Sequence, residues 1–197
     1  MRNRHNCHYV MDASVVINLL ATGCFAEILT YVSGSFVVVQ HVKDEVRIDP
    51  LTRQPHDNLL GTFIDSGTLQ IVDLGDNELN TFIDLVGASA PDDLDDGEAA
   101  TIAYATHNLA CPVIDENKGR RICREKFPSL DVIDTIDLLR MVRHGGEFSE
   151  MNFVRGIERA LTIGRMRVAD HHLEWLSSMV SREVLMGAPS LKRAIRY

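Results

Sequence analysis

The stretch "GEAATIAYATHNLACPVIDENKGRR", residues 97–121, places a helix, a strand and a second helix in direct succession. Small and apolar residues in "GEAATIAYATHN" are typical of a packed helix, and "CPVI" is a short apolar run that suits a buried strand. The pattern becomes helical again in "NKGRR". Asp115 stands directly after the strand. This order predicts a strand that ends in an acid and is flanked by helices.

The same alternation extends over most of the chain. Short runs predict strands at "HYVM", "FVVVQ", "LQIVDL", "CPVID" and "LDVID", and helical patterns separate them. Such alternation is typical of a parallel sheet with helices on both faces, so we expect an α/β fold. After residue 147 the strand patterns stop, and "SEMNFVRGIERALTIGR" and "DHHLEWLSSMVSREVL" predict two helices. We therefore divide the chain into a sheet domain, residues 1–146, and a helical C-terminal extension, residues 147–197.

Charge is distributed unevenly between these two parts. The chain has a net charge of −8 at pH 7. Residues 1–150 hold 12 Lys and Arg against 24 Asp and Glu, whereas residues 151–197 hold 8 against 4. The acidic part alone would repel nucleic acid. It would handle phosphates only if some carboxylates held divalent cations, because a bound cation reverses the local field.

The composition also indicates a compartment. The four cysteines form no C-x-x-C pair and match no zinc spacing, so we expect reduced and mostly buried thiols. No apolar run is long enough to cross a bilayer. Asp12 interrupts the apolar residues behind the basic N-terminus, which argues against a signal peptide. We expect a cytoplasmic protein with no membrane partner.

Several carboxylates are predicted to meet at one edge of the sheet. Parallel strands end at the same edge, and ligands bind there. Asp12 follows "HYVM" directly, and Asp115 and Glu116 follow "CPVI". Glu45 lies in the helix after "FVVVQ", and Glu98 opens the Ala-rich helix. Carboxylates gathered in one cleft cannot all stay ionised without compensation, which Mg²⁺ or Mn²⁺ would supply.

Each acid also has a purely structural interpretation. Asp12 suits the N-cap of the next helix, Glu98 favours the dipole of its own helix, and Glu45 in "KDEVR" suits a solvated helix face. Asp115 and Glu116 suit a solvated turn. In "DDLDDGEA" we expect Glu98 to be a ligand, while a solvated loop and helix start are formed by Asp92, Asp93, Asp95 and Asp96.

Four motifs together resemble the PIN-domain nucleases in order and spacing: "VMDASVVINLL", "VKDEV", "GEAATIAYA" and "VIDENKGRR". The resemblance covers about residues 8–145. The fourth motif, D-E-x-x-G-R, looks like a branch related to the toxins of toxin–antitoxin pairs. Two features depart from the family pattern, because the acidic run before Glu98 is heavier and the helical extension is longer.

The resemblance implies a PIN-like fold and an endoribonuclease that depends on Mg²⁺ or Mn²⁺. By the same resemblance, Glu116 is an auxiliary acid at the metal, and Ser14 orients Asp12 or contacts phosphate. The implied catalytic acids are Asp12, Glu45, Glu98 and Asp115, and the implied metal ligands are Asp12, Glu98, Asp115 and Glu116. RNA and an antitoxin protein are the implied partners. Two alternatives stay open: a regulatory module that cuts little and acts through partner binding, and a related DNA nuclease.

Basic residues are candidates for contacts with RNA. Arg120 and Arg121 suit backbone phosphates, or equally a helix-surface ion pair with Glu125. The extension contains four arginines that could contact RNA, or else pair with the acidic part of this chain or with a partner chain. They are Arg155, Arg159, Arg165 and Arg167.

The last predicted helix carries two further features. We expect His171 and His172 on the helix surface, without a functional role. Trp175 and Leu176 suggest an apolar surface for a partner chain, and we expect a homodimer.

Overall fold

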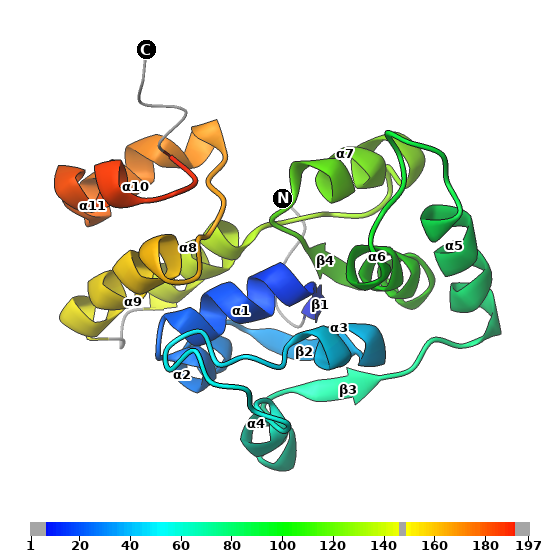
Figure 1. Ribbon diagram of the computed structural model, residues 1–197, viewed down its shortest axis with the longest axis horizontal. Helices are drawn as coiled ribbons and strands as arrows, with labels where there is room; N and C mark the ends of the chain where they lie inside the picture. The colour runs from blue at the N-terminus through cyan, green and yellow to red at the C-terminus, as the bar shows by residue number, and fades with distance from the viewer. Residues whose placement is uncertain (1–6, 146–148, 192–197) are drawn as a thin grey trace.

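The computed structural model describes residues 7–145 and 149–191. Within these residues, the centre is a sheet of four parallel strands in the order β3-β2-β1-β4 (Figure 1). The strands are β1 (Cys7–Met11), β2 (Gly34–Val39), β3 (Gln70–Val72) and β4 (Cys111–Val113). On central β1, Tyr9 pairs with Phe36 of β2 and with Cys111 of β4. The prediction of an α/β fold with a parallel sheet is confirmed.

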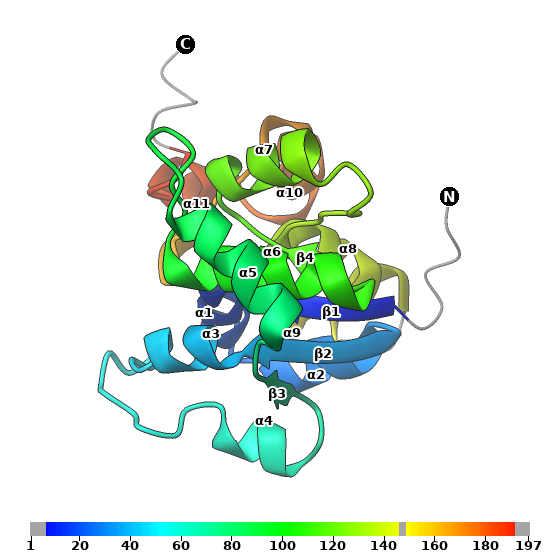
Figure 2. The ribbon, with the colours of Figure 1, turned by 90° about the vertical axis from the view of Figure 1, so that its right-hand side faces the viewer.

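Helices connect the strands and also follow β4. They are α1 (Ala13–Ala21), α2 (Phe25–Tyr31), α3 (Gln40–Glu45), α4 (Gly61–Asp65), α5 (Asp76–Val86), α6 (Asp96–Asn108), α7 (Asn117–Lys126) and α8 (Thr135–Gly145). On one face α6 packs on β1, β2 and β4, and α5 packs on α6; Figure 2 shows α5 in front of α6 and the sheet. On the other face α1, α2 and α8 contact one another. Right-handed connections between parallel strands explain these two layers.

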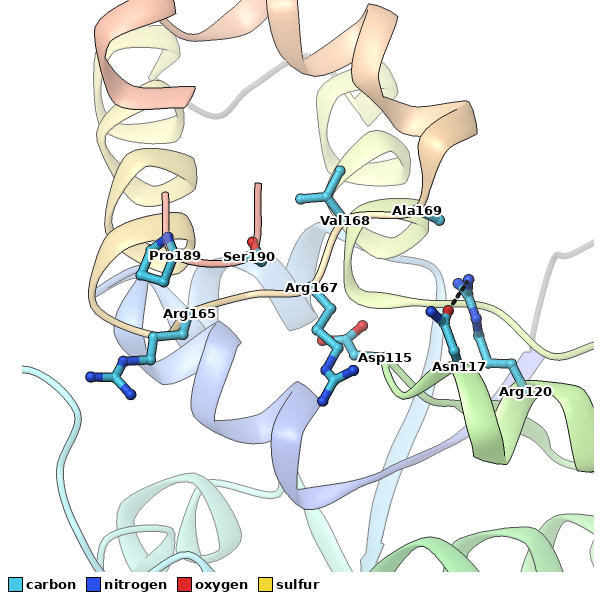
Figure 3. Close-up of a pocket in the computed structure, with 9 residues that line it drawn as sticks. All are labelled: Asp115, Asn117, Arg120, Arg165, Arg167, Val168, Ala169, Pro189 and Ser190. Atoms are coloured by element: carbon cyan, nitrogen blue, oxygen red, sulfur yellow. Dashed lines mark hydrogen bonds between the residues drawn. The ribbon is translucent and has the colours of Figure 1, made fainter. Parts of the chain in front are cut away.

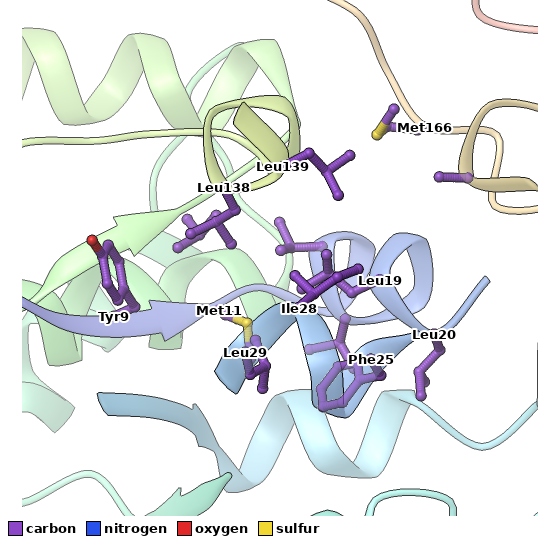
Figure 4. Close-up of a cluster of buried hydrophobic side chains, with 14 of the residues drawn as sticks. Tyr9, Met11, Leu19, Leu20, Phe25, Ile28, Leu29, Leu138, Leu139 and Met166 are labelled. Atoms are coloured by element: carbon purple, nitrogen blue, oxygen red, sulfur yellow. The ribbon is translucent and has the colours of Figure 1, made fainter. Parts of the chain in front are cut away.

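The main apolar core lies between the sheet and α1, α2 and α8 (Figure 4). Met11 of β1, Leu19 of α1 and Leu139 of α8 are all buried there. Most of α1 is buried, which explains why "VVINLLA" is almost entirely apolar. Gly23 ends this segment with a φ of +73°, a conformation that glycine adopts without strain.

The cysteine thiols are free, with Cys111 and Cys123 buried and Cys7 and Cys24 partly exposed. Within residues 7–145 and 149–191, no single helix is long and apolar enough to cross a membrane. Only α1 and α2 taken together, bent by 109°, reach that composition.

The predicted strand at "LDVID" is wrong as a full strand. Ile133 forms an isolated parallel bridge with Val113. Two hydrogen bonds support it, from Ile133 N to Pro112 O (3.1 Å) and from Ile114 N to Ile133 O (2.9 Å). Asp134 then accepts a hydrogen bond from Asp137 N at 3.0 Å. This cap begins α8 before strand pairing can extend.

The extension contains α9 (Glu150–Thr162), a 3-10 turn (Asp170–His172), α10 (Leu173–Met179) and α11 (Arg182–Gly187). The first predicted helix is confirmed, but the second is wrong as a single helix. Val180 is extended, with φ −123° and ψ 157°. Ser181 then caps α11 by accepting a hydrogen bond from Val184 N at 3.3 Å. A capping serine favours a new helix start over continuation of α10.

The described part of the extension shares the main core of the sheet domain. α9 packs on α1, and α11 packs on α9. Phe153 and Ile157 of α9 and Leu176 of α10 are buried in the same cluster as β1 and α1. The expectation that Leu176 lies on an exposed apolar surface is wrong, because its side chain covers this core. Trp175 beside it is half-buried. The predicted domain boundary at residues 146 and 147 lies outside the described residues.

A buried polar contact joins the extension to the sheet domain. His172 is fully buried, and its Nε2 lies 3.0 Å from each carboxylate oxygen of Asp134. Arg120 of α7 forms an ion pair with the same carboxylate. Burial opposes the charge of Asp134, but the contacts with His172 and Arg120 hold its pKa below the ordinary value. The prediction that His172 lies on a helix surface is wrong, because this contact draws the ring inside.

Replacing His172 by alanine should lower the free energy of unfolding by about 2–3 kcal/mol, because it removes a buried side chain and a hydrogen bond to a charged group. His171→Ala is the matched control, since His171 is exposed and should change stability by less than about 0.5 kcal/mol. Urea unfolding followed by circular dichroism measures both variants. Equal stability of the two would contradict the anchoring role of His172.

Candidate active site

The predicted acids lie near the carboxyl ends of the strands. Asp12 follows β1, and Asp115 comes two residues after β4. The backbone N–H of Asp12 donates to Val113 O at 3.1 Å, which joins the ends of these two strands. Glu45 is the last residue of α3, which follows β2 directly, and Glu98 lies in the first turn of α6.

Asp12 is held by the start of α1. It is buried and forms the N-cap of the helix, so its structural interpretation is correct. Ser14 donates to Asp12 Oδ2 from both its Oγ (2.6 Å) and its backbone N (3.2 Å). Burial raises the pKa of Asp12 to about 6, and the charge of Asp95 adds to this, while the Ser14 contact opposes it. Ser14 therefore orients Asp12, as the resemblance implies.

Asp115 is held by three donors without charge. Asn18 Nδ2 donates to its Oδ2 at 2.6 Å. Thr135 donates from its backbone N to Oδ1 at 2.8 Å and from its Oγ1 to Oδ2 at 2.7 Å. Burial still raises the pKa of Asp115 to about 6. These donors fix the orientation of the carboxylate but leave its charge uncompensated.

Glu98 is the most strongly perturbed of the four acids. It is buried on α6, and its backbone N–H is capped by Asp95 Oδ1 at 2.8 Å. Its Oε1 has no hydrogen-bond partner among the described residues. A Cβ at Gly119 would lie 2.8 Å from that oxygen, so a larger residue there would displace the Glu98 carboxylate. Burial, followed by the charges of Asp95 and Asp12, raises the pKa of Glu98 to about 8.

Glu45 reaches the same region from α3. Its residue is largely exposed, but its carboxylate lies against α6, where a Cβ at Gly97 would come within 2.7 Å of its Oε1. Burial of the carboxylate, together with the charges of Asp95 and Asp12, raises its pKa to about 7. Gly97 thus allows the backbone of α6 to pass close to the acid.

These acids form an electrostatically coupled group. Asp12 raises the pKa of Glu45 and of Glu98, and Asp95 raises the pKa of all three. Asp115 differs, because the negative charge that acts on it most is that of Asp134. A group of carboxylates that repel one another gains strongly from a bound cation.

The remaining predicted residues already have partners. Glu116 pairs with Arg167 Nε at 2.7 Å. Arg121 pairs with Glu125 at 2.8 Å, the helix-surface alternative, and also with Asp92 at 2.7 Å. In the "DDLDDGEA" run, Asp95 caps α6, in agreement with the expected helix start. Instead of a freely solvated loop, surface ion pairs are formed by Asp92 with Arg121 and Lys126 and by Asp93 with Lys118.

A second group of metal-binding residue types lies nearby. Asp134, His171 and His172 each offer one ligand atom, and these atoms lie within 4.8 Å of one another. Arg120 is paired with Asp134, so its guanidinium would repel a cation placed there. We interpret this group as the structural anchor of the extension rather than as a metal site.

Comparison with known families agrees with this geometry. Residues 8–181 match the model of a family described as a PIN domain, DUF3368. The chain belongs to this PIN-domain family. PIN domains are generally nucleases, and they usually use divalent metals. Among curated proteins, none matches the chain. The family match continues beyond α8 through α10, so this PIN domain includes part of the helical extension.

Sequence reasoning missed two positioning residues of the PIN domain. Asn18 lies one helical turn after Ser14 and is polar within an otherwise apolar helix, which was a usable signal. Thr135 follows the "LDVID" segment, so it lies at the same edge of the sheet as Asp115. Both side chains are buried and both donate to the Asp115 carboxylate.

The metal-free protein should lose stability as pH rises. Asp12, Glu45, Glu98 and Asp115 have pKa values of about 6 to 8 when folded, against 3.8 or 4.5 ordinarily. Between these values the folded state binds more protons than the unfolded state, so the stability present at low pH falls as pH rises through the folded pKa values. A loss of about 2 kcal/mol would lower Tm by roughly 4–8 °C.

Thermal unfolding in EDTA at pH 5 and at pH 8 measures this loss. Glu98→Gln should reduce the difference, since it removes the acid with the largest pKa shift. A wild-type Tm that is equal or higher at pH 8 would show that burial and neighbouring charges do not raise the pKa values of these acids as described.

Thr135→Val should weaken binding of Mn²⁺ by about 10–100-fold, because the variant keeps the shape but loses one donor to Asp115. Thr101→Val is a matched control, since Thr101 is also buried and its Oγ1 has no partner among the described residues. Isothermal titration calorimetry gives both affinities. Equal Mn²⁺ affinity in the two variants would contradict the prediction that Asp115 is a metal ligand.

Proposed function

We propose that this PIN domain is an endoribonuclease that depends on Mg²⁺ or Mn²⁺ and hydrolyses phosphodiester bonds of RNA. One observation carries the proposal. Burial raises the pKa of Glu45 and Glu98 beside the carboxyl edge of the sheet, the charge of Asp12 raises both further, and buried Glu98 Oε1 has no partner among the described residues. Family membership supports nuclease chemistry at this place.

The donor set suits a hard divalent cation. Asp12, Glu98 and Asp115 supply carboxylate oxygens, which Mg²⁺ and Mn²⁺ prefer to nitrogen or sulfur. Glu116 lies next to Asp115 and would join them by leaving Arg167. A bound cation would relieve the repulsion of these acids while they stay ionised, whereas without a cation they take up protons, as their raised pKa values show. The residues present therefore fit a divalent cation.

The chain's own residues would hold this chemistry in place. A bound cation would activate a water molecule and stabilise charge on the scissile phosphate. Ser14 keeps Asp12 oriented, and Asn18 and Thr135 keep Asp115 oriented, so the ligand oxygens need little rearrangement. Glu45 is the exposed acid of the group and would act directly or through water.

The toxin role and an antitoxin partner remain predictions, supported by the fourth motif "DENKGR". The homodimer also remains a prediction. RNA as the substrate is supported by the same resemblance. A DNA nuclease and a regulatory module that cuts little are therefore outcomes that the experiment must distinguish.

Glu98→Gln should reduce Mn²⁺-dependent cleavage of single-stranded RNA at least about 100-fold, because a central ligand loses its charge. The control replaces Asp92 and Asp93 by Asn. Both lie in surface ion pairs, which contribute little to stability, so cleavage should persist. A gel assay of end-labelled RNA and of DNA of the same sequence, with Mn²⁺ or with EDTA, measures the activity.

The outcomes separate the alternatives. Cleavage of DNA alone would indicate the DNA nuclease, and no cleavage of either strand would favour the regulatory module. Full activity of Glu98→Gln, together with loss of activity in the Asp92 and Asp93 variant, would place the site elsewhere in the acidic run.

A further inference from the structure

A pocket opens between the sheet domain and the extension (Figure 3). Its volume is about 470 Å³, within the range of about 300–1,000 Å³ for small-ligand sites. Figure 3 shows Arg165 and Arg167 on the segment after α9, Asn117 and Arg120 on α7, and Asp115 between the two sides. The pocket therefore begins at one of the predicted metal ligands.

The pocket concentrates positive charge in an acidic protein. Arg120, Arg165 and Arg167 line it, in a chain whose net charge is −8. Arg120 is paired with Asp134, and Arg167 is paired with Glu116. Arg165 is exposed and forms no ion pair with any acid in residues 7–145 and 149–191. At least one guanidinium is thus available for an anionic ligand.

The segment that carries these arginines is fixed against the site. A Cβ at Gly164 would lie 2.6 Å from Asn18 Oδ1, so the backbone there packs directly on Asn18. Asn18 in turn donates to Asp115. Arg165 follows with a φ of +60°, an uncommon conformation for a residue other than glycine and one that is found at ligand sites. The arginines therefore have a defined position relative to Asp115.

The rest of the lining is suited to a sugar and a base. Val168, Ala169 and Pro189 give the pocket an apolar wall, and Asn117 and Ser190 add polar groups. A ligand that fits this lining carries a negative charge at one end and a partly apolar body at the other. A nucleotide of an RNA strand has both, and its neighbouring phosphate would lie toward Asp115.

We propose that this pocket binds the nucleotide next to the scissile phosphate, with Arg165 and Arg167 on its phosphate and the apolar wall against its sugar and base. The assignment rests on the proposed ribonuclease function. It also predicts which of the two arginines contributes more to RNA binding. Arg167 must leave Glu116 to reach a phosphate, whereas Arg165 has no acid partner among the described residues, so Arg165→Ala weakens binding more than Arg167→Ala.

The test measures the Kd of a short fluorescein-labelled single-stranded RNA in Ca²⁺ buffer over a range of salt concentrations. Replacing both arginines by alanine should raise Kd at least about tenfold. It should also reduce the slope of log K against log salt by about 0.7, since both arginines act on one phosphate and each phosphate neutralised on a single strand contributes about 0.7. Arg182→Ala is the matched control, because Arg182 is an exposed arginine of α11 that does not line the pocket. It should leave Kd and slope nearly unchanged.

A folded double variant that binds RNA with the wild-type Kd and salt slope overturns the proposal. It is also overturned if a glutamate-rich peptide competes for the pocket more tightly than RNA does, because the pocket would then be a protein-binding site. Cleavage of the same RNA with Mn²⁺ is measured separately. Wild-type cleavage with arginine-independent binding disproves the pocket alone, whereas arginine-dependent binding without any cleavage disproves the nuclease alone.

Discussion

Repulsion among buried carboxylates is the constraint on which the site depends. Two unit charges about 4 Å apart interact by about 4 kcal/mol at an effective dielectric constant of 20. Burial is the largest cause that raises the pKa of Asp12, Glu45 and Glu98. Repulsion adds to it, because Asp95 acts on all three acids and Asp12 acts on Glu45 and Glu98. The fold tolerates this because the acids are attached to its best-packed elements. β1 and α1, which flank Asp12, contribute many fully buried side chains to the main core.

Two acids close to each other, Asp115 and Asp134, differ in whether the protein itself compensates their negative charge. Among the described residues, Asp115 receives hydrogen bonds from the neutral donors Asn18 and Thr135 alone, and its pKa is raised. Asp134 is adjacent to Thr135 but is paired with Arg120 and His172, and its pKa is lowered. The first carboxylate is oriented without being neutralised, whereas the second is neutralised by the protein itself. Compensation already present at Asp134 leaves Asp115 as the acid with charge available for an ion.

The sequence was informative wherever function follows from local position. Asp12 and Asp115 could be placed because an acid directly after a strand must lie near the sheet edge, whatever the rest of the fold does. Glu98 could be placed because the motif around it is specific. Thr135 was missed because its contact with Asp115 spans 20 residues and depends on a bridge too short to predict as a strand. His172 was misplaced for the same kind of reason, since its partner Asp134 lies 38 residues away.

Helix patterns had a similar limit. The apolar spacing in the extension correctly indicated helices, but it could not show that Val180 leaves the helix and that Ser181 starts another. The spacing of apolar residues indicates which side chains are buried, but it does not reveal a single extended residue between two helices. Cap geometry, which depends on one side chain and one backbone N–H, resolves that ambiguity.

The shared core has a consequence for how this PIN domain can be dissected. Phe153 and Ile157 are buried on α9, which packs on α1, the helix that also carries Ser14 and Asn18. Cutting the chain after α8 would leave the packed face of α1 exposed to water, and each large buried side chain accounts for about 1.5–3 kcal/mol. Such a deletion would change solubility and the order of α1 together. The described part of the extension is therefore part of the main core and cannot be deleted without disturbing α1. Its role should be studied by point substitutions on its exposed face.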